Sequence, residues 1–152
     1  MSPIASVRPG RQRQQCRVAP SALALMESAR HGLAAAEDES TASGRYVSAH
    51  LAALRAAAAV VAARAEPPGG RRRRPQSVWE LLPRVEPALQ EWAAFFAAGA
   101  AKRAAAEAGL PRAVSASEAD DLLHDAGTFV SLAEGALGIS AEQALLPLPT
   151  AG

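Results

Sequence analysis

The sequence predicts an all-α protein, folded as an up-and-down four-helix bundle with a short extra helical turn before the third helix. Of its 152 residues, 49% are hydrophobic and 4% aromatic, and alanine, the best helix former, is the most frequent residue. Apolar residues recur at steps of three and four along four long segments, as on one face of a helix. Pro, Gly and Ser clusters separate these segments, and none shows the alternation of a strand.

The first helix is expected from Ser21 to about Ala36, and the second from about Arg45 to Ala65. A Pro-Pro-Gly-Gly sequence at residues 67–70 ends the second helix. Residues at helical spacing predict the face that this helix turns to the core: Val47, Leu51, Leu54, Ala58 and Val61.

A third long helix is expected from about Glu86 to Ala108, after a short turn over residues 77–82 that opens with the capping-box pair Ser77 and Glu80. Its predicted core face consists of Leu89, Trp92, Phe95, Phe96 and Ala100. A glycine inside a helix costs about 1 kcal/mol against alanine, so Gly99 is consistent with a close helix crossing.

The last long helix follows a capping box, either Ser115 with Glu118 or Ser117 with Asp120. Its apolar side chains continue to Leu137 at helical spacing. Four long helices joined by modest loops favour antiparallel neighbours, hence the bundle.

Three parts are expected along the chain: a disordered basic tail over residues 1–20, the bundle over 21–138, and a mostly irregular tail over 139–152. The N-terminal arginines are not followed by the apolar region of a signal peptide. The uncharged apolar runs are shorter than the ~20 residues of a membrane span. Cys16 is the single cysteine and cannot form an internal disulfide. These features favour a cytoplasmic protein that contacts no membrane.

The formal charge of +1, from 16 Lys and Arg against 15 Asp and Glu, indicates no partner class. The arginines are concentrated in the N-terminal tail and in one run. This run could contact phosphates, as a candidate nucleic-acid-binding set, or form a solvated loop. No aromatic residue that could stack on a base interleaves with it. The run consists of Arg71, Arg72, Arg73 and Arg74.

Residues 44–58, with the sequence GRYVSAHLAALRAAA, resemble the core helix of HEPN domains (higher eukaryotes and prokaryotes nucleotide-binding). The block SVWELLP at residues 77–83, with the aromatic-containing helix after it, looks like one small HEPN family of high-GC bacteria. The resemblance covers about residues 21–138. It implies a helical bundle that often forms homodimers and binds RNA or nucleotides. A protein partner encoded by a neighbouring gene, as in toxin–antitoxin pairs, is a further expectation.

Catalytic HEPN proteins are similar to one another in an Arg-x4–6-His motif that cleaves RNA without a metal, and Arg45 and His50 match that spacing. The chemistry needs a base near neutral pKa to take the proton of the 2′-hydroxyl, which a histidine supplies. It also needs a fixed cation on the phosphate, which suits a guanidinium. The resemblance therefore makes Arg45 and His50 the candidate catalytic residues.

The two residues are five positions apart, which places them roughly 140° apart around a helix. They could converge if Arg45 lies at the mouth of the helix or if the site crosses a dimer interface. Three functions stay open: a non-catalytic module that binds RNA, a nucleotide or a protein; a metal-independent endoribonuclease; and a structural protein–protein interaction bundle. Without catalysis, His50 is expected to be a packing residue at the boundary of the core.

Asp120 and His124 are four positions apart on one helix, and Glu27 and His31 repeat the spacing. A carboxylate and an imidazole at this spacing can share a metal ion, but bundle metal sites need three or more converging ligands. Because no His-x3-His pair occurs, we predict neither a metal site nor a cofactor.

Overall fold

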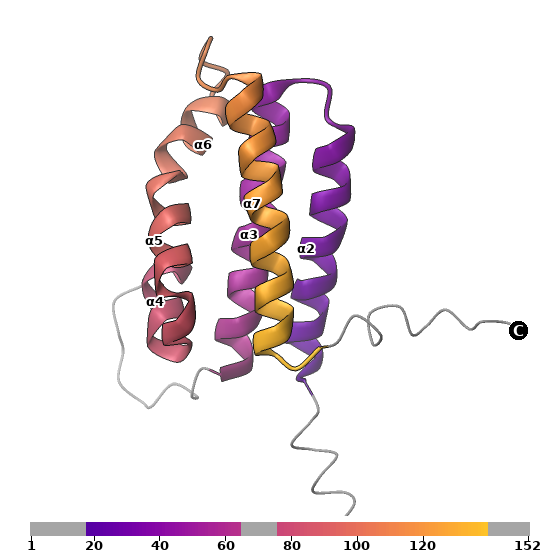
Figure 1. The fold of residues 1–152 in the computed structure, drawn as a ribbon, viewed down its shortest axis with the longest axis vertical. Coiled ribbons are helices and arrows are strands. Elements are labelled where there is room, and N and C mark those ends of the chain that lie inside the picture. The colour runs from indigo at the N-terminus through magenta and orange to yellow at the C-terminus, as the bar shows by residue number, and fades with distance from the viewer. Residues whose placement is uncertain (1–17, 65–75, 140–152) are drawn as a thin grey trace, which may run out of the picture.

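A computed structural model describes residues 18–64 and 76–139, and these residues form helices with no strand among them. Three long helices, α2 (Pro20–Asp38), α3 (Ala42–Arg64) and α7 (Ala116–Ala136), run side by side (Figure 1). The shorter α4 (Val78–Val85), η2 (Pro87–Leu89), α5 (Gln90–Ala98) and α6 (Ala100–Glu107) follow one another along the remaining side, and we call them the α4–α6 arm. The predicted all-α bundle is confirmed. The arginine run and most of both predicted tails lie outside the described residues.

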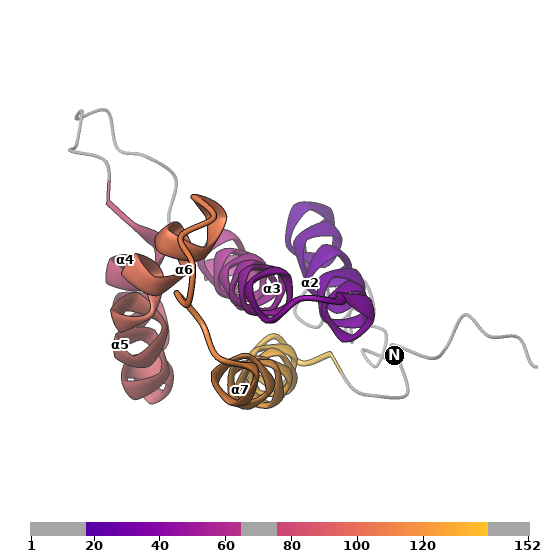
Figure 2. The same cartoon turned by 90° about the horizontal axis from the view of Figure 1, so that it is seen from above.

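Helix α3 is the centre of the bundle. It packs against α2, α7, α4 and α6, and the end-on view shows it between α2 and the α4–α6 arm, beside α7 (Figure 2). By length and composition α3 could also cross a membrane, but half of its most apolar window is buried, as in the core helix of a soluble protein.

The predicted core stripe of α3 is wrong by one position. All five residues of that stripe, from Val47 to Val61, are only partly buried. The buried residues are mainly small ones: Tyr46, Ala49, His50, Ala52, Ala53, Ala56, Ala57, Ala59 and Val60. Because α3 has neighbours on several sides, its closest contacts need the smallest side chains, and the larger residues fill the gaps between helices.

The expected continuous third helix over 86–108 is also wrong, because the chain breaks twice there. Pro87 begins a 3-10 turn before α5, and Gly99 separates α5 from α6, with its N–H bonded to the Phe96 carbonyl 3.0 Å away. A Cβ on Gly99 would lie 2.8 Å from the Tyr46 hydroxyl. Gly99 therefore leaves room for the end of the Tyr46 side chain from α3, and this close contact coincides with the break.

Large aromatic side chains attach the α4–α6 arm to the other helices. Phe96 is fully buried, and its ring centroid lies 5.3 Å from that of Trp79 and 5.2 Å from that of Phe129 on α7. Phe95, which was also expected in the core, is 45% exposed.

Polar contacts fix the helix ends as the sequence predicts. Ser77 with Glu80 and Ser115 with Glu118 both form complete capping boxes at the starts of α4 and α7. Near the C-terminal end of α7, the buried carboxylate of Glu134 accepts a bidentate ion pair from Arg30 on α2, with Nε 2.8 Å from Oε2.

The contact at Gly99 gives a stability prediction. Gly99→Ala is expected to destabilise the fold by about 1–2 kcal/mol, because the new methyl group overpacks against Tyr46. Tyr46→Phe removes the hydroxyl and should reduce that loss. Urea unfolding measures both effects.

Gly127→Ala is the matched control, because Gly127 lies within α7 and a Cβ added there would have nothing within 4 Å. It should stabilise the protein by up to about 1 kcal/mol, the helix preference of alanine over glycine. If Gly99→Ala stabilises the protein as Gly127→Ala does, the close contact between Gly99 and the Tyr46 hydroxyl is wrong.

Candidate functional site

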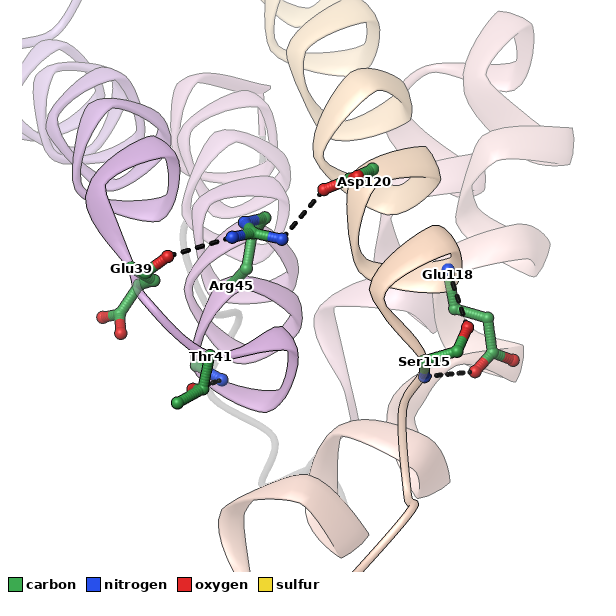
Figure 3. A network of polar contacts seen from close by, with 7 residues as sticks. Glu39, Thr41, Arg45, Ser115, Glu118 and Asp120 are labelled. Carbon is green, nitrogen blue, oxygen red and sulfur yellow. Dashed lines mark hydrogen bonds and ion pairs between the residues drawn. The ribbon is translucent and has the colours of Figure 1, made fainter.

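Arg45 lies in the first turn of α3, next to the ends of two other helices (Figure 3). Thr41, just before α3, accepts a hydrogen bond from the Gly44 N–H at 2.9 Å and so caps the helix. The Arg45 guanidinium donates to the Glu39 carbonyl at the end of α2 at 3.0 Å, and to Asp120 Oδ1 in α7 at 2.9 Å. Arg45 therefore joins three helices at one end of the bundle.

The charge of Arg45 suits this position. The last turn of α2 contains no basic residue, although the carbonyl end of a helix favours a nearby cation. Arg45 provides that cation from α3, and the Asp120 carboxylate offsets the cost of a positive charge at the N-terminus of α3. The Arg45 side chain remains 21% exposed and that of Asp120 65%.

His50 lies in the core, one and a half helical turns further along α3, and is 1% exposed. Its Nε2 is 2.8 Å from the Phe96 carbonyl oxygen. Because a carbonyl can only accept, Nε2 carries the proton and donates it. The carbonyl that accepts this hydrogen bond lies at the break between α5 and α6. The rings of Tyr46, Trp79 and Phe96 surround the imidazole at centroid distances of 6.3, 6.2 and 5.9 Å.

Burial lowers the pKa of His50 below its ordinary value, because the core disfavours the charged imidazolium. The hydrogen bond to Phe96 raises the pKa and only partly opposes this effect. In the neutral ring Nδ1 is an acceptor, and it has no hydrogen-bond partner among the described residues. Protonation would add a second buried donor without a partner.

The structure does not bring Arg45 and His50 together. No hydrogen bond joins them within residues 18–64 and 76–139, and each has its own separate partners. The expectation of a packing histidine at the core boundary needs one correction: His50 lies inside the core. The candidate run Arg71–Arg74 lies outside the described residues.

The described residues have a different charge from the whole chain. They contain eight Lys and Arg against thirteen Asp and Glu, a formal charge of −5. The other eight basic residues, all arginine, and two glutamates lie in the remaining segments. The helical bundle is therefore acidic, although the chain as a whole carries +1.

No group of three or more His, Cys, Asp or Glu side chains that could hold a metal ion occurs within the described ranges. Asp120, one of the spaced carboxylates, pairs with Arg45. His124 instead lines an open groove of about 380 Å³ between α2 and α7, with Leu33, Glu37, Leu123, Gly127, Thr128 and Ser131.

A second open groove, of about 310 Å³, lies between α5 and α7 and is lined by Glu91, Trp92, Phe95 and Asp125. We call it the α5–α7 groove. The helical pattern did not reveal it, because that pattern places Trp92 and Phe95 in the core. The signal that could have found it is Glu91 beside two aromatic residues, but Asp125 joins them only through the fold.

These features define the class: an all-α bundle with an arginine and a histidine at the start of its central helix. Residues 35–134 match the family described as HEPN_SAV_6107-like HEPN, which is about two thirds of the chain. The chain belongs to this HEPN family. Neither the curated proteins nor the solved structures provide a match.

The buried His50 predicts a pH-dependent stability. The unfolded chain binds a proton near pH 6.5, while the folded protein resists it, so the unfolded state holds more protons below that pH. The free energy of unfolding should therefore be highest above about pH 6.5 and fall below it, by at most about 1.4 kcal/mol per pH unit for one proton. Urea unfolding between about pH 7.5 and 5.5 measures the slope.

Substitutions of the three histidines separate their contributions. His31→Gln and His124→Gln, which replace two exposed histidines, are the control variants. His50→Gln should remove the slope. An unchanged slope in His50→Gln would contradict the assignment to the buried imidazole.

Proposed function

We propose that this HEPN protein is a cytoplasmic, non-catalytic module that binds RNA or a nucleotide. The observation that carries the non-catalytic part is the burial of His50. A general base must come within hydrogen-bond reach of the 2′-hydroxyl proton. His50 is 1% exposed, and its Nε2 already donates to Phe96. Because the rings of Tyr46, Trp79 and Phe96 surround the imidazole, a substrate could reach it only after these side chains had moved.

The contacts of Arg45 support the same proposal. Its guanidinium already binds a carboxylate and a helix-terminal carbonyl, so a phosphate would compete with Asp120 for it. Removal of the guanidinium would also leave the end of α2 without its cation. Both residues of the Arg-x4-His motif thus have structural roles within one chain.

For RNA binding, the distribution of charge supports the arginine-rich segments as the contact. A bundle with a formal charge of −5 repels phosphates. The run Arg71–Arg74 joins α3 to α4, and four adjacent guanidinium groups favour a polyanion. We propose this run as the RNA-binding segment.

A second candidate function is a protein–protein interaction bundle, in the simplest case a homodimer. The sequence from Trp92 to Ala101 is uncharged. Within this stretch, four small apolar residues on α5 and α6 are exposed: Ala94, Ala97, Ala98 and Ala101. A second helix could approach this side closely, and light scattering of the full chain measures the resulting oligomer.

If the proposal is correct, the purified protein does not cleave RNA in the presence of a chelator and releases no 2′,3′-cyclic phosphate ends. Gel analysis of an end-labelled RNA measures this outcome. Arg45→Lys is the informative variant, because Arg45 lies nearer the surface than His50. Metal-independent cleavage that is lost in a folded Arg45→Lys protein would establish the endoribonuclease alternative instead.

RNA binding by the arginine run predicts a salt effect. Replacement of Arg71–Arg74 by serine should flatten the slope of log affinity against log salt by up to about three units. Each phosphate contact that is lost leaves fewer counterions to be released when the RNA binds. The matched control replaces the four tail arginines, Arg8, Arg11, Arg13 and Arg17, with the same change in net charge. Equal slopes in the two variants would show that bulk charge, and not the run, determines binding.

A further inference from the structure

The α5–α7 groove combines two aromatic side chains with two carboxylates. Trp92 and Phe95 come from α5 with Glu91, and Asp125 comes from the facing side of α7. The groove has a volume of about 310 Å³ and opens to solvent. Neither the Arg-x4-His motif nor the arginine run contributes to it.

The aromatic wall is held rigidly. The rings of Trp92 and Phe95 meet edge to face, with centroids 6.2 Å apart and an angle of 83°. Behind Trp92, the rings of Phe96 and Phe129 lie 6.0 and 5.8 Å away. Because Phe95 is 45% exposed, this wall presents an aromatic surface to solvent. Because the rings pack against one another, little side-chain entropy of Trp92 and Phe95 is lost when a ligand binds.

The two carboxylates of the groove belong to the acidic side chains that have no ion-pair partner in the described bundle. Of the thirteen acidic residues that the structure describes, five form ion pairs: Glu86, Glu107, Glu118, Asp120 and Glu134. Glu91 and Asp125 form none within the described parts of the chain, and no basic side chain from those parts lines the groove. Asp125 is half-buried, which strengthens its attraction for a cation that displaces water.

We propose that the α5–α7 groove binds the guanidinium group of an arginine carried by an exposed segment of a partner protein. A guanidinium is planar and weakly hydrated, stacks on aromatic faces and donates to carboxylates in a fork. An ammonium group satisfies the carboxylates but stacks less well. The four groove residues thus fit arginine better than lysine.

The shape and charge of the groove disfavour other occupants. A small-molecule site encloses most of its ligand, whereas this groove is open. RNA phosphates would meet two unpaired carboxylates. The described bundle of a second copy carries the same −5 charge, so it offers no excess of cationic groups to an acidic groove. This inference goes beyond the proposed RNA-binding function and does not depend on it.

Calorimetric titration of the full chain with a tetra-arginine peptide amide tests the proposal. We expect saturable binding that is tighter than that of tetra-lysine at the same ionic strength. The double variant Glu91→Gln/Asp125→Asn should weaken it about tenfold, as two partly exposed ion pairs would. Phe95→Ala should weaken it about threefold through the lost aromatic contact. In a Trp79→Phe background, fluorescence from Trp92 alone reports binding in the groove.

Two matched controls separate the groove from bulk charge and general hydrophobicity. Glu27→Gln/Glu37→Gln removes the same charge from exposed positions on α2. Leu110→Ala removes an apolar side chain that is 54% exposed. Both controls should bind tetra-arginine as the wild type does, and circular dichroism confirms that each variant is folded.

Four results would overturn the proposal. The first is no saturable binding by the wild type, and the second is equal weakening by the groove and control double variants. The third is equal affinity for the two peptides. The fourth is a change in Trp92 fluorescence, without any peptide, when the chain's own arginines are replaced by serine, because these arginines would then be the occupant of the groove. They are Arg8, Arg11, Arg13, Arg17 and Arg71–Arg74.

Discussion

The close approach of the other helices to α3 is made possible by its buried alanines, and the remaining contacts depend on it. At Ala49, Ala53 and Ala57 no side-chain atom beyond Cβ separates α3 from its neighbours, so the packing at these positions gains dispersion energy without large apolar residues. The few large side chains are therefore concentrated in one part of the core. They gather where the α4–α6 arm meets α3 and α7, which explains how a chain with 4% aromatic residues still builds an aromatic cluster.

At that junction, His50, Tyr46 and Gly99 form one connected arrangement. Gly99 allows the Tyr46 hydroxyl to approach the backbone, the helix breaks there, and His50 donates to the Phe96 carbonyl at the break. The Nε2–H of His50 thus gives the Phe96 carbonyl a hydrogen-bond partner at the point where the regular helical hydrogen bonds are interrupted. The same arrangement places the imidazole out of reach of solvent, so the histidine that suggested catalysis is part of the core of this HEPN protein.

The described helices and the remaining segments carry net charges of opposite sign, although the net charge of the whole chain is close to zero. The described helices carry an excess of acidic residues, while half of the basic residues lie outside them. The bundle is thereby suited to contact cationic groups, and the arginine-rich segments to contact anions. The two partners that we propose, one cationic and one anionic, would not compete with each other, since the α5–α7 groove and the arginine run differ in sign of charge and in position along the chain.

The sequence by itself determined the fold class, the family and the two capping boxes, because these depend on local propensity, periodicity and short-range hydrogen bonds. It could not determine which face of α3 is buried, because alanine is apolar on every side and gives no directional signal. Only the tertiary structure paired Arg45 with Asp120, 75 positions away, and His50 with Phe96, 46 positions away. The same spacing of arginine and histidine fits a catalytic pair or two separate structural residues. The packing of α6 and α7 on α3 decided how buried each side chain is and which partner it meets, and no pattern within one helix contains that information.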